Sequence, residues 1–104
     1  MSMPVLTPAQ RAEAQRKAAA VRKERSELMA ALKAGELPLT ALLKRDDAVV
    51  GRIRVRRVLQ SLPGIGAVRA GRLLTDLSIS DTRRVQGLGP RQRARLLELF
   101  PRQV

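Results

Sequence analysis

The first third of the chain has the spacing of a helix but almost no apolar stripe. Between residues 9 and 27 the apolar positions are nearly all alanine, with Val21 the exception, so a helix here has no wide face to bury. Thr7, Pro8 and Gln10 form the pattern of a capped helix start, and Gly35 is a helix stop. Larger apolar residues come only near the stop: Leu28, Met29 and Leu32. The pattern predicts one long helix that docks on a core by its C-terminal end.

Two shorter apolar segments follow. Leu39, Leu42 and Leu43 have the i, i+3, i+4 spacing of a short helix with one buried face. The segment DDAVVGRIRVRRVLQSL, residues 46–62, is ambiguous, because RIRVR alternates like a strand while its later apolar residues keep helical spacing. No other segment offers a partner strand. We therefore expect a helix here, broken near Gly51 or Arg54.

The last 43 residues contain an internal repeat: residues 62–74, LPGIGAVRAGRLL, align without gaps on residues 85–97, VQGLGPRQRARLL. Each copy has a Gly-aliphatic-Gly corner and then a helix with arginines outward and a leucine pair inward. Between the copies, Ser78 or Ser80 is expected to cap a further helical turn, and Pro101 to end the last helix after Phe100. The predicted fold is all-α, with a basic helical arm, residues 1–35, and a compact helical domain, residues 36–104.

Charge and composition narrow the function. A net charge of +12 on 11.5 kDa favours a polyanionic partner, with nucleic acid ahead of a membrane surface or an acidic protein. Zero Cys and zero His exclude zinc sites, disulfides, thiol nucleophiles and imidazole triads. The adjacent pair Asp46 and Asp47 is better explained as a helix cap than as a catalytic site, so we expect no enzyme and no cofactor. One Phe, with no Trp or Tyr, argues against binding unpaired bases by stacking.

The chain contains no apolar run long enough to span a membrane, and its start, MSMPVLTPAQ, lacks the regions of a secretion signal. We therefore expect a cytoplasmic protein. No amphipathic surface demands a partner copy, so a monomer is expected.

The Gly-aliphatic-Gly corners suggest how a phosphate could be bound. Glycine allows positive φ and removes side chains from the tip, and a helix that starts at the second glycine points unpaired N–H groups and its positive dipole end outward. Ile65 and Leu88 would then point inward. In the second corner Pro90 stands where the first has Ala67, which removes one donor. The alternative is that each corner is only a tight turn.

Arginines flank both corners and are expected to reach neighbouring phosphates: Arg69 and Arg72 in the first copy, Arg91, Arg93 and Arg95 in the second. Val68 lies beside them. The arm is either a solvated helix or a segment that orders against a polyanion. Its candidate contacts are Arg16, Lys17, Arg22 and Lys23.

The residues LPGIG resemble the helix-hairpin-helix corner of many DNA-binding proteins, and are also shared with repair proteins and ribosomal protein S13. The ordered combination of the basic alanine-rich arm, LPGIG, TRRV and GLG is more specific, and resembles the actinobacterial integration host factors over almost the entire chain. These are nucleoid-associated proteins with a helix-two-turns-helix fold. The resemblance implies sequence-independent binding of double-stranded DNA with bending or compaction, and support of phage integration and chromosome organisation. It also implies a nucleoid location and a phage integrase or a topoisomerase as protein partners.

Carried over residue by residue, the DNA contact of the family's hairpin falls on Pro63, Gly64, Ile65 and Gly66. The paired arginines of the family fall on Arg83 and Arg84. Ala67 and Gln86 stand where the family usually has basic residues, and Arg69, Arg54 or Arg56 are candidates to compensate. The main alternative is an RNA-binding, ribosome-associated module of the S13 type.

Overall fold

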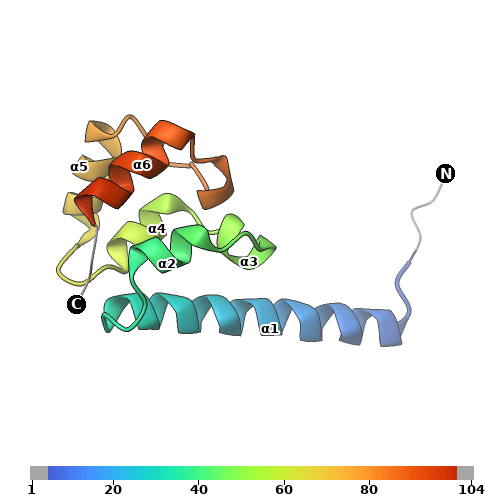
Figure 1. Cartoon of the computed structure of the whole chain (residues 1–104). Helices are drawn as coiled ribbons and strands as arrows, with labels where there is room; N and C mark the ends of the chain where they lie inside the picture. Colours follow the sequence, from blue (N-terminus) through green and yellow to red (C-terminus); the bar gives the residue numbers. More distant parts are fainter. Residues whose placement is uncertain (1–4, 101–104) are drawn as a thin grey trace.

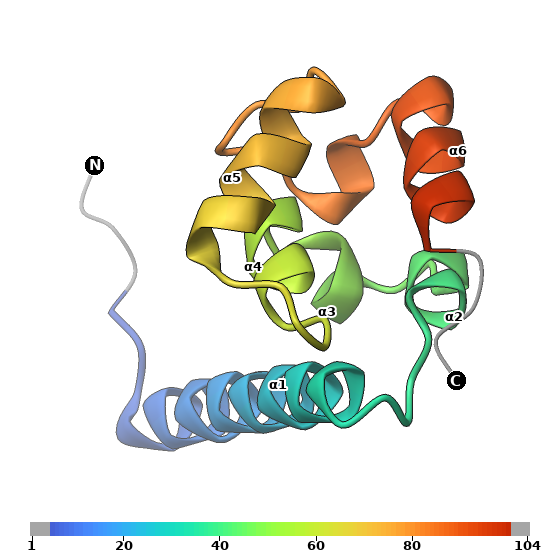
Figure 2. The ribbon, with the colours of Figure 1, turned by 90° about the vertical axis from the view of Figure 1, so that its left-hand side faces the viewer.

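The chain folds into helices that stack in three tiers, as the computed structural model shows for residues 5–100 (Figure 1). The elements are α1 (Pro8–Lys33), α2 (Leu39–Lys44), α3 (Ala48–Gly51), α4 (Val55–Gln60), α5 (Ala67–Asp76), the 3₁₀ turn η1 (Val85–Gly87) and α6 (Pro90–Leu99). Helix α1 lies on one side of α2, α3 and α4, and α5 and α6 lie on the other side (Figure 2). The predicted all-α fold is confirmed for the described residues.

Helix α1 has both ends that the sequence predicts. The Thr7 hydroxyl accepts from the Gln10 amide at 3.1 Å, and the Gln10 side chain accepts from the Thr7 amide at 2.9 Å. Past the other end Gly35 has φ +75°, and the amides of Gly35 and Glu36 donate back to the carbonyls of Leu32 and Ala31. This is a Schellman motif, in which glycine takes the left-handed position.

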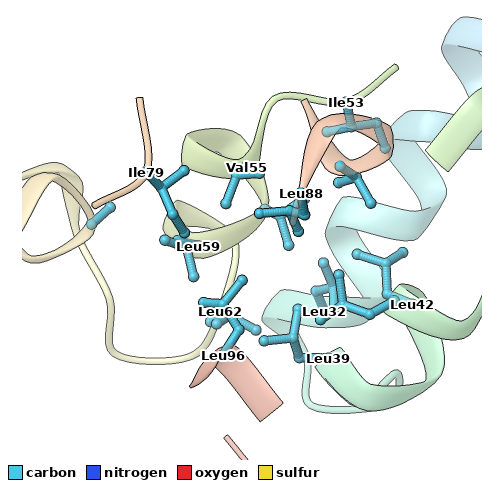
Figure 3. Close-up of a cluster of buried hydrophobic side chains, with 14 of the residues drawn as sticks. Leu32, Leu39, Leu42, Ile53, Val55, Leu59, Leu62, Ile79, Leu88 and Leu96 are labelled. Carbon is cyan, nitrogen blue, oxygen red and sulfur yellow. The ribbon is translucent and has the colours of Figure 1, made fainter. Parts of the chain in front are cut away.

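Only the C-terminal turns of α1 join the core, as the apolar pattern predicts. Met29 and Leu32 are buried while Val21 is exposed. Leu32 lies with Leu39, Leu42, Leu62 and Leu96 in one cluster, which the close-up shows (Figure 3). Residues of the predicted arm, 1–35, therefore contribute to the core of the predicted domain, 36–104.

The ambiguous segment is two short helices with a break at Arg52, Ile53 and Arg54, close to where the sequence predicts one. The expectation that RIRVR has no partner is wrong. The Val55 amide donates to the Arg83 carbonyl and the Val85 amide to the Ile53 carbonyl, both at 2.9 Å, which makes an antiparallel bridge between Arg54 and Arg84. The alternation is real over three residues: Ile53 and Val55 are buried, and Arg54 between them is exposed.

The expected helical turn after Ser78 or Ser80 is also wrong, since residues 79–84 are not helical. Ser78 instead ends α5, with φ 55°. The amides of Ser78 and Ile79 donate to the carbonyls of Thr75 and Leu74, which is a second Schellman motif with serine in the place of glycine. Ile79, the next residue, is buried, so the chain returns to the core at this point. Helix α6 ends at Leu99, and Pro101 lies outside the described residues.

Arg45 fastens the middle of α1 to the start of α3. Its guanidinium donates to Glu24 at 2.9 Å and to Asp47 at 2.7 Å. The hydrogen bond to Glu24, more than the one to Asp47, raises the pKa of Arg45. Asp47 is the N-cap of α3, where its carboxylate accepts from the Val50 amide at 3.0 Å. The hydrogen bond from the Val50 amide, and then the one from Arg45, lower the pKa of Asp47 below its ordinary value. The prediction that Asp47 is a helix cap is confirmed.

Replacing Asp47 by alanine should lower the free energy of unfolding at neutral pH by roughly 1–2 kcal/mol, because α3 loses its cap and Arg45 loses one partner. A carboxyl whose pKa is lowered on folding stabilises the fold above its unfolded pKa, and this contribution is lost as the pH falls through the folded value. The difference between parent and variant should therefore shrink below about pH 4. Urea unfolding at several pH values measures it, and a difference that persists unchanged in acid would contradict this account.

Candidate nucleic-acid interface

The first corner, residues 62–66, connects α4 to α5 and is anchored from inside. Leu62 and Ile65 are buried, and the Ile65 amide donates to the Leu62 carbonyl at 3.2 Å. Pro63, Gly64 and Gly66 are exposed. The connection reaches toward the C-terminal end of α1 (Figure 2), where the Ser61 hydroxyl lies 3.3 Å from the Met29 sulfur. The inward direction predicted for Ile65 is confirmed.

The two glycines of the first corner are needed for different reasons. Gly64 has φ +75°, a conformation that other residues adopt only with strain. Gly66 has ordinary extended dihedrals, and a Cβ built on it meets nothing within 4 Å. Neither backbone conformation nor packing inside the protein requires glycine at position 66. A bare backbone is useful there if another molecule approaches it closely.

Helix α5 begins at Gly66, and its first backbone amides are free to donate. Gly66 is its N-cap, makes no side-chain cap, and accepts the first helical bond from the Ala70 amide at 3.0 Å. The amides of Ala67, Val68 and Arg69 therefore have no partner within the helix. All three residues are exposed, and the first turn carries no acidic residue. Amides at the positive end of a helix dipole, without a competing carboxylate, are a site for an anion such as a phosphate.

The surroundings of the first corner are cationic, with one apolar side chain. Arg69 and Arg72 are exposed on α5. Val68, in the first turn, is 73% exposed. An apolar residue beside a phosphate site can contact the sugar edge of a nucleic acid without offering a charge.

The second corner, residues 85–89, does not repeat this geometry, contrary to the expectation from the sequence repeat. Neither Gly87 nor Gly89 has a positive φ. The Gly89 amide is occupied by the Gln92 side chain at 3.0 Å, and the same side chain donates to the Ser78 carbonyl at 2.9 Å. Pro90 has no N–H to offer. Leu88 points inward as predicted. The second corner nevertheless has fewer free amide donors than the first, because Pro90 lacks an N–H and the Gln92 side chain occupies the Gly89 amide.

Arginines from the two bridged segments meet on one surface. The bridge sets Arg54 beside Arg84, and both are exposed. Arg83 is exposed as well, and donates to the Gly87 carbonyl at 3.0 Å. A Cβ at position 87 would lie 3.1 Å from the Arg83 side chain, so a larger residue there would displace this arginine by a few tenths of an ångström. Arg91 is exposed at the start of α6.

Arg93 and Arg56, both predicted to bind phosphate, have partners from distant parts of the sequence. Arg93 is half-buried and donates to the carbonyl of Leu43 at 2.6 Å and to that of Val85 at 3.4 Å, so its guanidinium joins α6 to α2 and η1. Arg56 forms an ion pair with Asp81 at 2.5 Å. The periodicity of the sequence indicates that an arginine is exposed, but it does not show that the side chain contacts a carbonyl or carboxylate from a distant part of the chain.

Some basic side chains of the arm line surface hollows together with residues outside α1, and others form ion pairs within α1. A hollow beside α3 is lined by Lys17, Arg22, Arg25 and Arg52, and an adjoining hollow is lined by Arg25, Arg52, Arg54, Arg57 and Arg84. We call these seven residues the basic track. None of them has an ion-pair partner within residues 5–100, whereas Arg16 pairs with Glu13 and Lys23 with Glu27. Sequence analysis missed Arg52 and Arg57, although their exposed positions between buried residues follow the local apolar pattern.

Comparison with known proteins agrees with this architecture. Residues 32–100 match the family model of the S13-like H2TH domain. The integration host factor of Mycobacterium tuberculosis is 48% identical over 102 residues, covering 96% of this chain and 97% of the relative. That of Streptomyces coelicolor is 46% identical, covering 96% and 95%.

The chain belongs to the actinobacterial integration host factors, with an S13-like H2TH domain. A solved structure of sIHF bound to an 8-bp palindromic DNA is similar to it with a TM-score of 0.80 and 42% identity, covering 82% of this chain and 98% of that one. The family predicted from LPGIG, TRRV and GLG is confirmed.

Two residues that depart from the expected pattern of this family differ in their surroundings. Ala67 is exposed in the first turn of α5, so the missing positive charge lies next to the free amides. Gln86 lies against α3, where a Cβ on Gly51 would meet its side chain at 3.1 Å. Of the three arginines expected to compensate, Arg69 and Arg54 are exposed, whereas Arg56 is paired with Asp81.

Within residues 5–100, no three His, Cys, Asp or Glu side chains are grouped to hold a metal ion. The same residues contain no helix that is both long and apolar enough to cross a membrane.

Proposed function

We propose that this protein binds double-stranded DNA by its phosphate backbone, largely without reading sequence, and that it bends or compacts DNA in the nucleoid without catalysing a reaction. The observation that carries the proposal is Gly66. Nothing inside the protein requires glycine at this position, and Gly66 stands at the start of a helix whose first amides are free and whose first two turns carry Arg69 and Arg72. The DNA-bound relative supports the same ligand.

The mechanism follows from the kinds of group present. Amides and guanidiniums bind phosphate oxygens, which every base sequence presents alike, so they fix position and orientation but carry little sequence information. The first corner binds a phosphate on one strand, and Arg69 and Arg72 extend the contact along the backbone. The basic track holds phosphates further along. Two separated contacts on a rigid body can hold a duplex in a bend at a cost of a few kcal/mol.

The partners and state follow the same proposal. One copy of the chain carries both the first corner and the basic track, so a monomer is sufficient for binding. The proposed protein partners are enzymes that act on the bound DNA, a phage integrase or a topoisomerase, because the family resemblance implies them. The proposed location is the cytoplasmic nucleoid.

The affinity for a duplex should fall steeply with salt and hardly at all with sequence. If Arg54, Arg69, Arg72 and Arg84 each neutralise one phosphate, log affinity should fall against log salt with a slope of about −3.6, or roughly 150-fold between about 50 and 200 mM. Fluorescence titration of two labelled duplexes of unrelated sequence measures this. A slope near zero, or a strong preference for one sequence, would contradict the proposal.

An RNA duplex of equal length is the second arm of that titration. A-form RNA has a different groove shape and carries 2′-hydroxyls. Tighter binding of RNA than of DNA would favour the ribosome-associated alternative, and the proposed DNA function would then be wrong.

A further inference from the structure

One carboxylate stands among the arginines of the proposed DNA-binding surface. Asp81 lies in the loop between α5 and η1, next to Thr82, Arg83 and Arg84, and its side chain is 68% exposed. It forms an ion pair at 2.5 Å with Arg56 of α4. From residue 77 to residue 97 the sequence has no other acidic residue. A negative charge here repels the phosphate backbone that the surrounding cations attract.

The Arg56 side chain is held across α5 by this pair. The Arg56 guanidinium lies against the helix at Gly71, where a Cβ would meet its nitrogens at the ordinary contact distances of 3.6 and 3.7 Å. Arg56 is 36% exposed, and one side of its fork is occupied by the carboxylate. In the free protein Arg56 is therefore less available to a phosphate than Arg69 and Arg72, which are exposed on α5.

The pair is well suited to be exchanged. An ion pair this exposed contributes little to folding stability, because water screens it and two long side chains must be ordered to make it. Carboxylate and phosphate offer the guanidinium fork the same paired-oxygen geometry. When Arg56 binds a DNA phosphate, counterions are released from the duplex, whereas its pairing with Asp81 releases none. The phosphate can therefore displace the carboxylate.

We propose that Asp81 competes with DNA phosphate for Arg56: it holds Arg56 in the free protein and gives it up when the duplex binds. This inference rests on the proposed DNA-binding function. Asp81 lowers the affinity twice, because the pair must be broken and because its charge then faces the backbone. It thereby keeps binding to DNA weak enough to be reversed.

A positioning role would look different. If the pair only fixed the loop that carries Arg83 and Arg84, it would persist in the complex, and removing either partner would weaken binding. The two roles predict opposite coupling. Under competition, Arg56 contributes more to binding once Asp81 is neutralised. Under positioning, Arg56 contributes less, because its partner has already gone.

The test is a double-mutant cycle on the full chain, with Asp81→Asn, Arg56→Ala and the double variant titrated against one labelled 20-bp duplex. Asp81→Asn should bind at least about threefold tighter than the parent. Arg56→Ala should weaken binding more in the Asp81→Asn background than in the parent. Asp76→Asn is the matched control, since it removes an equal charge from the exposed end of α5. Circular dichroism of all variants should be unchanged.

The outcomes separate the two hypotheses. If the parent does not bind the duplex at low salt, the proposed function is wrong and the competition falls with it. If the parent binds but Asp81→Asn is no tighter than Asp76→Asn, only the competition is wrong. Weaker binding by Asp81→Asn, or a smaller effect of Arg56→Ala in that background, would assign the pair to positioning and overturn the competition as well.

Discussion

Replacing Gly66 by aspartate should leave the fold as stable as before, or more stable, while removing most of the DNA affinity. Aspartate is a favoured N-cap and its charge complements the helix dipole, which together contribute roughly 0.3–1 kcal/mol. The extended dihedrals of Gly66 suit it, and a Cβ there meets nothing within 4 Å. The same carboxylate, however, would accept from the free amides of α5 and occupy the place of the phosphate. We expect affinity to fall by roughly 100-fold, through one lost contact and one new repulsion.

The second corner supplies the control for Gly66→Asp. Gly89 is also an N-cap with extended dihedrals, but Pro90 has no N–H and the Gly89 amide is already bound by Gln92. Gly89→Asp changes the net charge by the same amount, so its effect on DNA binding should be no more than about threefold, the size of a distant screened charge. Thermal unfolding and the duplex titration measure both variants. Equal losses at the two corners would mean that net charge alone explains the binding.

The difference between the two corners could not be predicted from the repeat. Both share the Gly-aliphatic-Gly letters, and both bury the aliphatic residue, because an apolar side chain between two exposed positions has one direction to go. The dihedrals and the donors diverge through residues outside the corner. Gln92 reaches back to Gly89 and Ser78, and such side-chain caps depend on where the preceding loop has come to lie.

The arm and its core contact were predictable, because local rules determine them. The capping box at Thr7, the stop at Gly35 and the apolar turns between Leu28 and Leu32 each follow from neighbours in sequence. The bridge between Arg54 and Arg84 was not predictable, since three alternating residues are too few to distinguish a strand from a helix and the partner lies 30 positions away. The arginines divide in the same way: their exposure follows the apolar pattern, but the partners of Arg56 and Arg93 come from the tertiary fold.

Changing Arg54 and Arg84 together to alanine should make binding weaker and less dependent on salt. The two side chains are exposed next to each other by the bridge and line the basic track. If each binds one phosphate, the slope of log affinity against log salt should fall in magnitude by about 1.8, and affinity near physiological salt should fall at least roughly 10-fold. The bridge itself uses backbone groups of Ile53, Val55, Arg83 and Val85, so truncating these side chains leaves its hydrogen bonds in place and the fold should persist.

The arm offers a control of equal charge. Arg16 and Lys23 each have a carboxylate partner on α1, at 2.7 and 4.0 Å, whereas none of the residues of the basic track has one in the described chain. Arg16→Ala with Lys23→Ala removes two positive charges, as the first double variant does, but should change the salt slope by less than about 0.5, since both cations lie outside the basic track and the carboxylate beside each repels the phosphate backbone. Equal slopes for the two double variants would show that DNA senses only the total charge. A loss confined to Arg54 and Arg84 would place the duplex against the bridge, with the first corner at one end of the contact and the arm along its side.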